Sequence, residues 1–227
     1  MAFYPFLNSE RERLKNLDIK LEQVSESPIY GTALTNAAKD IINEAAEPQD
    51  ADFAAVQFTL TKILLSILDE DSVKEEYSER KSNDFRDSLE KESLTYLIKI
   101  AREDFGMDVR TEDSLRIHFT DFLRYKPDFL KLSQMNLLEG YVQVTKTQFT
   151  WVLKGAIKKQ ILAGIPEKRE FPEALVKAAN LVKGKAVREK RQIERPRVKN
   201  LKEEYLPPCI VGILKGIETG KANHNAH

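Results

Sequence analysis

Apolar side chains recur at helical spacing along much of the first half of the chain. Residues 49–126 contain no proline and only one glycine, Gly106, and helix interiors disfavour both residue types. Within this stretch apolar positions repeat every three or four residues over 55–68 and again over 89–101, which is the spacing of one helix face. Ser27-Pro28 is typical of a helix start. The pattern therefore predicts consecutive helices, the last of them ended by Gly106.

The segment 70–87 is far more polar than the segments on either side of it. We expect it to form an exposed helix, or a loop with helical turns, outside the central core. Carboxylates can bind Mg²⁺ where they converge, but no glycine-rich phosphate loop accompanies these. We therefore interpret the local carboxylates as exposed charge, namely Asp69, Glu70, Asp71, Asp84 and Asp87.

The pattern changes after about residue 111. Residues 115–119 alternate between apolar and polar side chains, and residues 141–145 are rich in β-branched residues, so both segments are predicted to be strands. Helical spacing returns over 147–162 and again over 172–194. The chain is thus predicted to be mainly α, an elongated helical domain with a small inserted α/β module.

The apolar residues around the second predicted strand allow two interpretations. A module of about 50 residues buries little surface by itself. The set is therefore either its core or a surface for the helical domain or another chain, and it consists of Tyr141, Val142, Val144, Phe149 and Trp151. Core is the better interpretation for any single residue, whereas the strand as a whole is compatible with a partner surface.

Charge is balanced in total but unevenly distributed along the chain. There are 36 Lys and Arg against 36 Asp and Glu. Residues 1–113 hold 14 basic and 25 acidic side chains, a net of −11, and residues 114–227 hold 22 and 11, a net of +11. Such asymmetry between halves indicates an interaction partner where the total charge does not. It places any nucleic-acid contact in the second half.

Positive charge is densest between residues 183 and 202, where nine Lys and Arg face two Glu, a net of +7. Such a tract can neutralise phosphates, although a solvated helix face that balances the acidic half has the same composition. No aromatic residue is interleaved, so the base stacking of single-strand binders is not supported. The candidate nucleic-acid-binding residues are Arg188, Lys190, Arg191, Arg195 and Arg197.

Several protein classes are disfavoured. The first residues lack the features of a secretory signal, and the apolar clusters are far shorter than the roughly 18–20 residues of a membrane span. The single cysteine, Cys209, excludes a disulfide within the chain. We expect a cytoplasmic protein without a membrane partner. The common nucleotide-loop, zinc-protease and hydrolase motifs are absent from the sequence, so no catalytic residue is assigned and His118 is interpreted as structural.

Three segments, in the same order, resemble the large subunit of archaeal and eukaryotic DNA primase. Residues 206–210, Leu-Pro-Pro-Cys-Ile, are similar to the motif that carries the first of four cysteine ligands of a [4Fe–4S] cluster in that family. Residues 220–227 match the element that follows, with one extra residue. Residues 4–7, Tyr-Pro-Phe-Leu, resemble the N-terminus of archaeal members, and residues 132–144 resemble a family segment that leads into a strand. The resemblance spans almost the entire chain.

The resemblance implies where the domains of the chain begin and end and what its cysteine binds. A helical domain would occupy 1–112, the α/β module 113–168, a basic helix that completes the helical domain 169–202, and the start of a truncated iron–sulfur domain 203–227. Cys209 would be the first ligand of a [4Fe–4S] cluster in the full-length protein only. Because such a cluster requires four cysteines, none is expected in this chain.

The resemblance implies that the chain belongs to a non-catalytic regulatory subunit. It would form a heterodimer with the catalytic small subunit, docked through Tyr141, Val142 and Val144, and its basic tract would contact template DNA and RNA primer during initiation. A stand-alone helical nucleic-acid-binding adaptor and an interaction scaffold are the alternatives. Salt-dependent binding of DNA by this chain alone would favour the adaptor.

Overall fold

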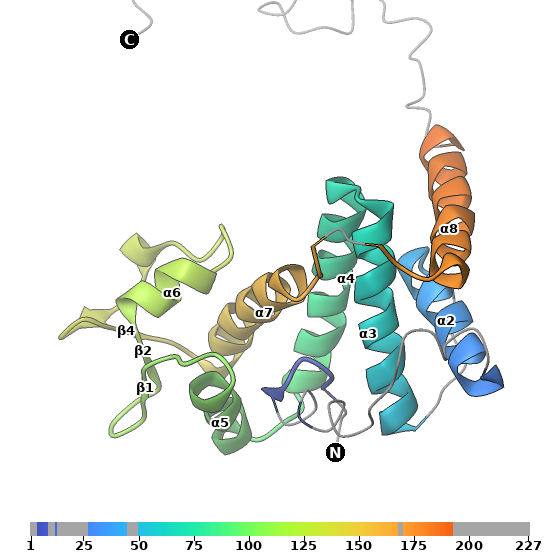
Figure 1. Ribbon diagram of the computed structural model, residues 1–227. Helices are drawn as coiled ribbons and strands as arrows, with labels where there is room; N and C mark the ends of the chain where they lie inside the picture. The colour runs from blue at the N-terminus through green and yellow to red at the C-terminus, as the bar shows by residue number, and fades with distance from the viewer. Residues whose placement is uncertain (1–3, 9–11, 13–26, 45–49, 168–169, 193–227) are drawn as a thin grey trace, which may run out of the picture. The chain divides into compact units, whose positions relative to one another are not determined.

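The structure is a computed structural model that describes residues 4–8, 12, 27–44, 50–167 and 170–192, with side chains described as far as residue 184. Figure 1 labels its elements. The helices are α2 (Pro28–Ile41), α3 (Ala51–Leu68), α4 (Asp71–Leu89), α5 (Leu94–Glu103), α6 (Phe119–Tyr125), the 3-10 helix η2 (Leu132–Gln134), α7 (Lys146–Ala163) and α8 (Glu173–Gln192). The strands are β1 (Val109–Arg110), β2 (Arg116–His118), β3 (Leu137–Leu138) and β4 (Tyr141–Gln143).

A small antiparallel sheet accompanies the helices, and this confirms the predicted fold class, a mainly helical protein with a small α/β module. The strand order is β1-β2-β4-β3. The two predicted strands, β2 and β4, lie side by side at its centre, with Ile117 opposite Val142. The edge strands β1 and β3 were not predicted, because two residues are too few to show an alternating pattern.

The first helices begin and end where their terminal residues indicate. Pro28 stands in the first turn of α2, directly after Ser27, and the Asp50 carboxylate accepts a hydrogen bond from the Phe53 amide at the start of α3. After α5 the amide of Met107 donates to the Ala101 carbonyl at 2.9 Å across Gly106, whose φ is +62°. Glycine adopts that conformation at little cost, so the predicted end of this helix is confirmed.

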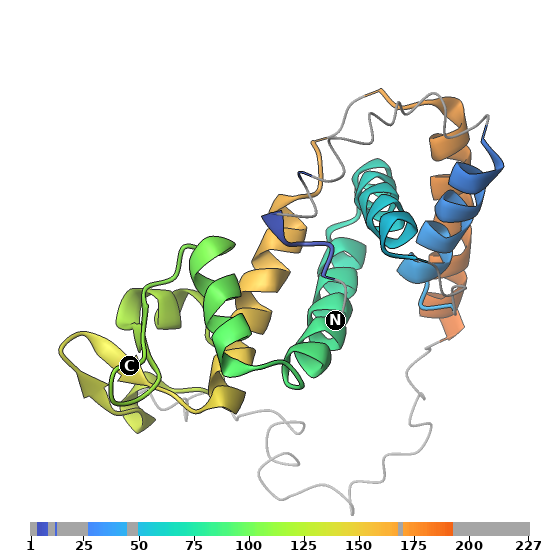
Figure 2. The same cartoon turned by 90° about the horizontal axis from the view of Figure 1, so that it is seen from below.

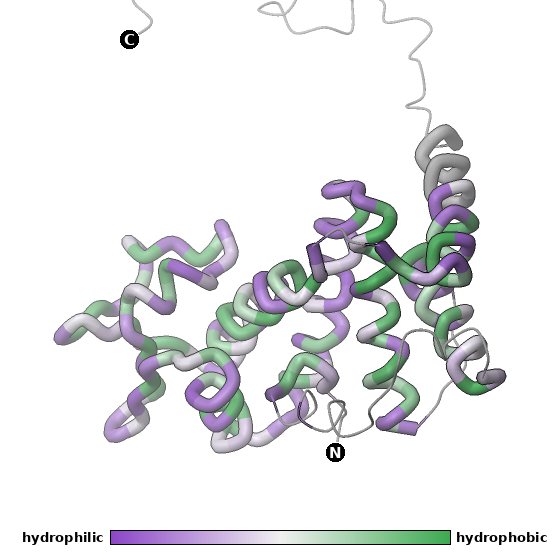
Figure 3. Tube along the Cα trace, in the orientation of Figure 1, coloured by the Kyte–Doolittle hydropathy of each residue, from purple (hydrophilic) through white to green (hydrophobic). Residues whose placement is uncertain are grey.

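Helix α3 is more apolar than the sequence analysis allowed. Its 18 residues are long and apolar enough to cross a membrane by length and composition alone, although 56% of this window is buried inside the protein. Figure 3 shows the contrast between α3 and its hydrophilic neighbour α4. One buried helix of this kind is a weak indication of membrane insertion, because the core helix of a globular protein has the same properties.

Helix α4 confirms a helix in the polar segment but contradicts the expectation that it lies outside the core. Tyr77, Ser78 and Ser82 are buried along one face, and α4 packs along α7 (Figures 1 and 2). The two serine hydroxyls bond back to the carbonyls of Glu75 and Glu79 at 2.9 Å. Small side chains whose hydroxyls are satisfied within their own helix can be buried without an unpaired polar group.

Helix α7 is the element on which α4, α5 and α6 pack. A reciprocal pair of hydrogen bonds between Thr145 and Gln148 caps its start. Its buried face contains Phe149, Val152, Leu153, Ala156, Ile157 and Ile161, and it contacts α4, α5 and α6. These contacts belong to one compact unit, Met1–Ala186, and the remaining residues, Val187–His227, form a second. The domain boundaries given above stay predictions.

Candidate partner interface

The three residues predicted to contact a partner are buried within the chain. Tyr141, Val142 and Val144 expose 6%, 0% and 6% of their surfaces. Strand β4 lies between β2 and β3, so Val142 has Ile117 on one side and Leu137 on the other. Side chains this buried offer almost no area to another chain. In the folded chain these three residues therefore belong to the core, which was the alternative interpretation, and their contact with a partner stays a prediction.

Tyr141 is fixed by contacts within the module. Its hydroxyl donates to the Asp108 carboxylate at 2.5 Å, and the guanidinium of Arg110 lies 4.0 Å from its ring centroid. The hydrogen bond to Asp108 raises the pKa of Tyr141. His118 meets the same ring edge-on at 5.3 Å, while its Nδ1 lies 2.7 Å from the Thr120 hydroxyl. This arrangement agrees with a structural histidine.

Five large apolar side chains of the same module are exposed instead, namely Phe129, whose ring packs against Trp151, and four on α6 and β3. Phe119 and Leu123 stand four residues apart on α6, and Leu137 and Leu138 form β3, where they are 49% and 54% exposed. Helix α6 contacts β4, the strand beside β3 (Figure 1). Single exposed apolar residues are normal, but α6 and β3 both contact β4, and a group of exposed apolar residues is typical of an interaction site. We call the four residues on α6 and β3 the apolar surface.

The exposure of Leu137 and Leu138 follows from their position at an edge of the sheet. Adjacent strand residues point to opposite faces, so both are exposed only where neither face is covered. The turn between β3 and β4 consists of Glu139 and Gly140, with φ of +52° and +83°. Two successive residues of positive φ give the tight turn that matches the twist of a hairpin. A Glu-Gly pair is a weaker signal than Asn-Gly, which explains why the hairpin was missed.

Helix α6 is held on α7 by a contact that only glycine allows. A Cβ atom on Gly155 would lie 1.9 Å from the Tyr125 carbonyl oxygen, so the end of α6 rests directly on the backbone of α7. Lys159 donates from Nζ to the Arg124 carbonyl at 2.6 Å. This satisfies one of the free carbonyls at the end of α6. The contact fixes the helix that carries Phe119 and Leu123.

Four of the five acidic residues predicted to be exposed charge are exposed, and Glu70 is partly buried. Asp71 is 97% exposed at its side chain, and Asp69 is half exposed. Lys74 lies 3.2 Å from Asp69 and 3.4 Å from Asp71. Within the ranges that the structure describes, no group of three or more His, Cys, Asp or Glu is arranged to hold a metal ion.

The remaining candidate residues are only partly described. Arg188, Lys190 and Arg191 lie within α8, whereas Arg195, Arg197 and Cys209 lie outside the described residues. Lys183, the tract residue whose side chain is described, lies 3.4 Å from Glu70. Binding of nucleic acid by the tract and of a cluster by Cys209 therefore stay predictions.

No family model matches the chain, but individual proteins do. The DNA primase large subunit PriL of Methanosarcina acetivorans is 23% identical over 239 residues, which cover 97% of this chain and 64% of that protein. The proteins of the same name from Methanosarcina mazei and Methanocella arvoryzae are each 24% identical, over 97% and 96% of this chain and 64% and 63% of their own lengths.

The chain therefore spans a little less than two thirds of the length of the curated relatives it matches. The similarity covers 96–97% of this chain. Together these matches confirm that the chain resembles the large subunit of archaeal DNA primase over nearly its whole length.

Proposed function

We propose that the chain is the N-terminal part of a non-catalytic primase large subunit that binds the catalytic small subunit through the apolar surface. The names of the relatives support a primase large subunit. The observation that carries the docking site is the exposure of Leu137 and Leu138 at the edge of the sheet, together with Phe119 and Leu123 on α6. Covering such residues on association is favourable, at about 25 cal/mol per Å² of apolar surface.

In this proposal the chain supports primer synthesis without performing the chemistry. Nucleotidyl transfer would reside in the small subunit, and the large subunit would stabilise it and assist initiation on template DNA in the cytoplasm. The basic tract between residues 183 and 202 would add contacts with template or primer phosphates, supported by its net charge of +7. A [4Fe–4S] cluster does not fit this chain alone, because it needs four thiolates and the chain has one cysteine.

Co-elution tests the docking site. The chain and the catalytic small subunit of the same organism are mixed at low salt and separated by size. We expect a complex with the wild-type chain, weakened about tenfold or more by Leu137→Asp, because a charge would be buried in an apolar contact. Leu181→Asp is the matched control, since Leu181 is an exposed leucine on α8, outside the apolar surface.

Two outcomes would contradict the docking site. The first is no complex although both proteins are folded, and the second is equal weakening by Leu137→Asp and Leu181→Asp. If the chain instead binds DNA tightly by itself, and loses that binding on charge reversal of Arg188 and Arg191, the stand-alone adaptor is favoured. The charge split between the halves is the observation on which that alternative rests.

A further inference from the structure

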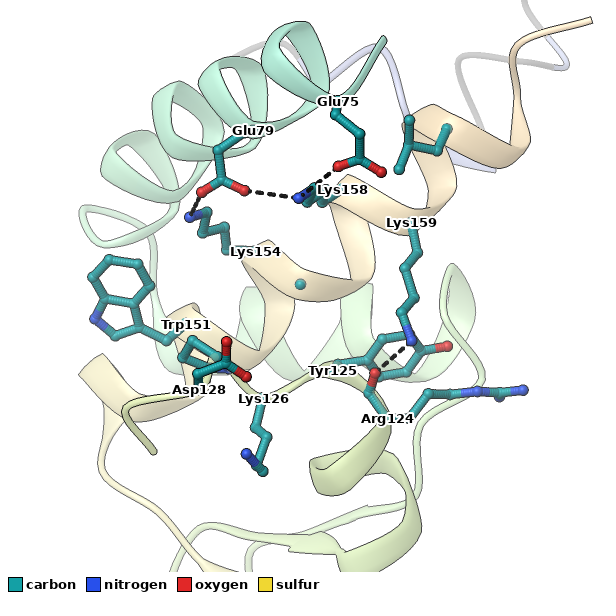
Figure 4. A pocket seen from close by; sticks show the side chains of 13 residues that line it. Glu75, Glu79, Arg124, Tyr125, Lys126, Asp128, Trp151, Lys154, Lys158 and Lys159 are labelled. Carbon is teal, nitrogen blue, oxygen red and sulfur yellow. Dashed lines mark hydrogen bonds and ion pairs between the residues drawn. The ribbon is translucent and has the colours of Figure 1, made fainter. Parts of the chain in front are cut away.

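A pocket of about 440 Å³ lies between α4, the end of α6 and α7 (Figure 4). Its size is within the range of small-molecule sites. As far as the structure describes side chains, its lining shares no residue with the apolar surface or the basic tract. Five of the lining residues are cationic, three are acidic and two are aromatic.

Positive charge comes from one side of the pocket and most of the negative charge from the other. Lys154, Lys158 and Lys159 stand on α7, and Arg124 and Lys126 lie at the end of α6. Glu75 and Glu79 project from α4 on the opposite side (Figure 4), and Asp128 completes the set. With five cations against three carboxylates, the lining carries a net charge of +2.

The two α4 carboxylates hold lysine side chains at the pocket wall. Glu79 accepts a hydrogen bond from Lys154 and lies 3.1 Å from Lys158, which also lies 2.9 Å from Glu75. The hydrogen bond from Lys154 lowers the pKa of Glu79, and that with Glu75 raises the pKa of Lys158. Both groups are therefore charged at neutral pH. An ammonium group has three donors, so these pairs orient the lysines without using all of their protons.

The cations near the end of α6 keep hydrogen-bond donors or charges that a ligand could use. Lys159 donates one hydrogen bond to the Arg124 carbonyl, which leaves two donors on its ammonium group. Among the described residues, neither Arg124 nor Lys126 forms an ion pair with a carboxylate. Gly155 lets the end of α6 rest on α7, so the backbone that carries Arg124 and Lys126 lies beside α7, although their side chains extend away from Lys154 and Lys158 (Figure 4).

The two aromatic rings of the pocket already have cations against them. The guanidinium of Arg86 lies 4.0 Å from the Trp151 ring centroid, and Lys159 lies 5.3 Å from that of Tyr125. A nucleobase would have to displace these contacts to stack there. The pocket is therefore suited to an anionic group rather than to a base.

We infer that this pocket binds a phosphate group, carried either by a nucleoside triphosphate or by a nucleic-acid strand. Several ammonium and guanidinium donors on two adjoining elements suit the three or more oxygens of a phosphate better than the two of a carboxylate. The inference does not depend on the docking of a small subunit.

Tryptophan fluorescence of the full chain tests the inference. Trp151 is the only tryptophan in the sequence and lines the pocket, so its emission reports occupancy. Inorganic tripolyphosphate is the first ligand, and a short oligothymidylate and a nucleoside triphosphate follow. We expect saturable binding that weakens as salt is raised. Titration calorimetry with the same ligands covers binding that leaves the emission unchanged.

Substitutions of lining residues should change the affinity for tripolyphosphate in opposite directions, depending on the charge that is removed. Arg124→Gln and Lys126→Gln should each weaken tripolyphosphate binding, by up to about fivefold per cation. Glu75→Gln should strengthen it by a similar factor, because Lys158 would lose one of its two carboxylates. Lys131→Gln removes an exposed lysine outside the pocket and is the control. Thermal unfolding of each variant verifies that it is folded.

A comparison of the affinities of the three ligands shows which kind of molecule carries the phosphate. Tighter binding of the oligothymidylate than of the triphosphate would assign the pocket to a strand, and the reverse would assign it to a free nucleotide. No saturable binding of any ligand by either method would overturn the inference. So would weakening of binding by Glu75→Gln, or equal effects of Lys131→Gln and Arg124→Gln.

Discussion

Strands β3 and β4 are neighbours in one sheet, and both carry large apolar side chains, yet their environments differ completely. Val142 on β4 is fully buried, while Leu138 on β3 is 54% exposed. Strand β4 is flanked on both sides, whereas β3 ends the sheet. Exposure at these positions is decided by strand order and not by the hydrophobicity of the strand. The inner side of the module is therefore core, and the outer side is available to a partner.

The largest expected loss of stability is caused by a charge placed in the buried, inner side of the module. Val142→Asp would bury an unpaired carboxylate between β2 and β3, which costs about 4 kcal/mol or more. Since domains of this kind have a free energy of unfolding of about 5–15 kcal/mol, the variant should be unfolded or barely folded. Urea unfolding followed by circular dichroism measures this. A stability close to that of the wild type would show that β4 is not core.

The long elements could be predicted from the sequence because their signals are local. The face over 55–68 and the face of α7 each repeat over several turns, and proline and glycine mark their ends. The burial of α4 could not be predicted in the same way. Its buried face consists partly of Ser78 and Ser82. In the sequence these serines resemble surface residues, because their burial depends on the packing of α7 against α4.

The position of the candidate interface could not be predicted from the local sequence, because it depends on contacts between distant residues. Whether Val142 or Leu138 is exposed follows from the order of strands in the sheet, to which residues as distant as Ile117 contribute. The approach of Tyr125 to Gly155 joins residues that are far apart in the sequence. A glycine in the middle of a predicted helix was the one available signal for it, since such a glycine usually has a packing reason. The resemblance to the primase family pointed to β4, whose side chains are buried, whereas the exposed apolar residues lie on α6 and β3.

A smaller effect is expected where α6 meets α7. Gly155→Ala would place a Cβ atom 1.9 Å from the Tyr125 carbonyl oxygen, so the two elements must separate, at a cost of about 1–3 kcal/mol. Displacement of α6 would also move Phe119 and Leu123 and weaken binding to the small subunit. Thermal unfolding and co-elution measure the two consequences.

Gly31→Ala is the matched control for that variant. Gly31 also lies within a helix, but nothing lies within 4 Å of a Cβ atom there. Alanine should therefore stabilise the chain by up to about 1 kcal/mol. If both substitutions were stabilising, the close contact between α6 and α7 would not exist in solution.

The ion pairs between α4 and α7 should contribute less, and in a manner that depends on pH. The hydrogen bond from Lys154 holds the pKa of Glu79 below its usual 4.5. Stabilisation by ionised Glu79 is therefore present above pH 4.5 and is lost as the pH falls through the lowered value. Because the Glu79 side chain is 46% exposed, screening limits the difference to about 1 kcal/mol or less. Urea unfolding of Glu79→Gln and wild type at several pH values measures it, and a difference that does not change with pH would contradict this role.

The smallest effect on stability is expected on the outer side of the module. Leu138→Asp introduces the same carboxylate as Val142→Asp, one strand away, but at a solvated edge. Its free energy of unfolding should stay within about 0.5 kcal/mol of the wild type, because the carboxylate keeps its water. Its affinity for the small subunit should nevertheless fall by about tenfold, since docking would remove that water. Urea unfolding and titration with the small subunit measure the two quantities on one preparation. A loss of stability as large as that of Val142→Asp would place β3 in the core, and an unchanged affinity would place the partner on another surface.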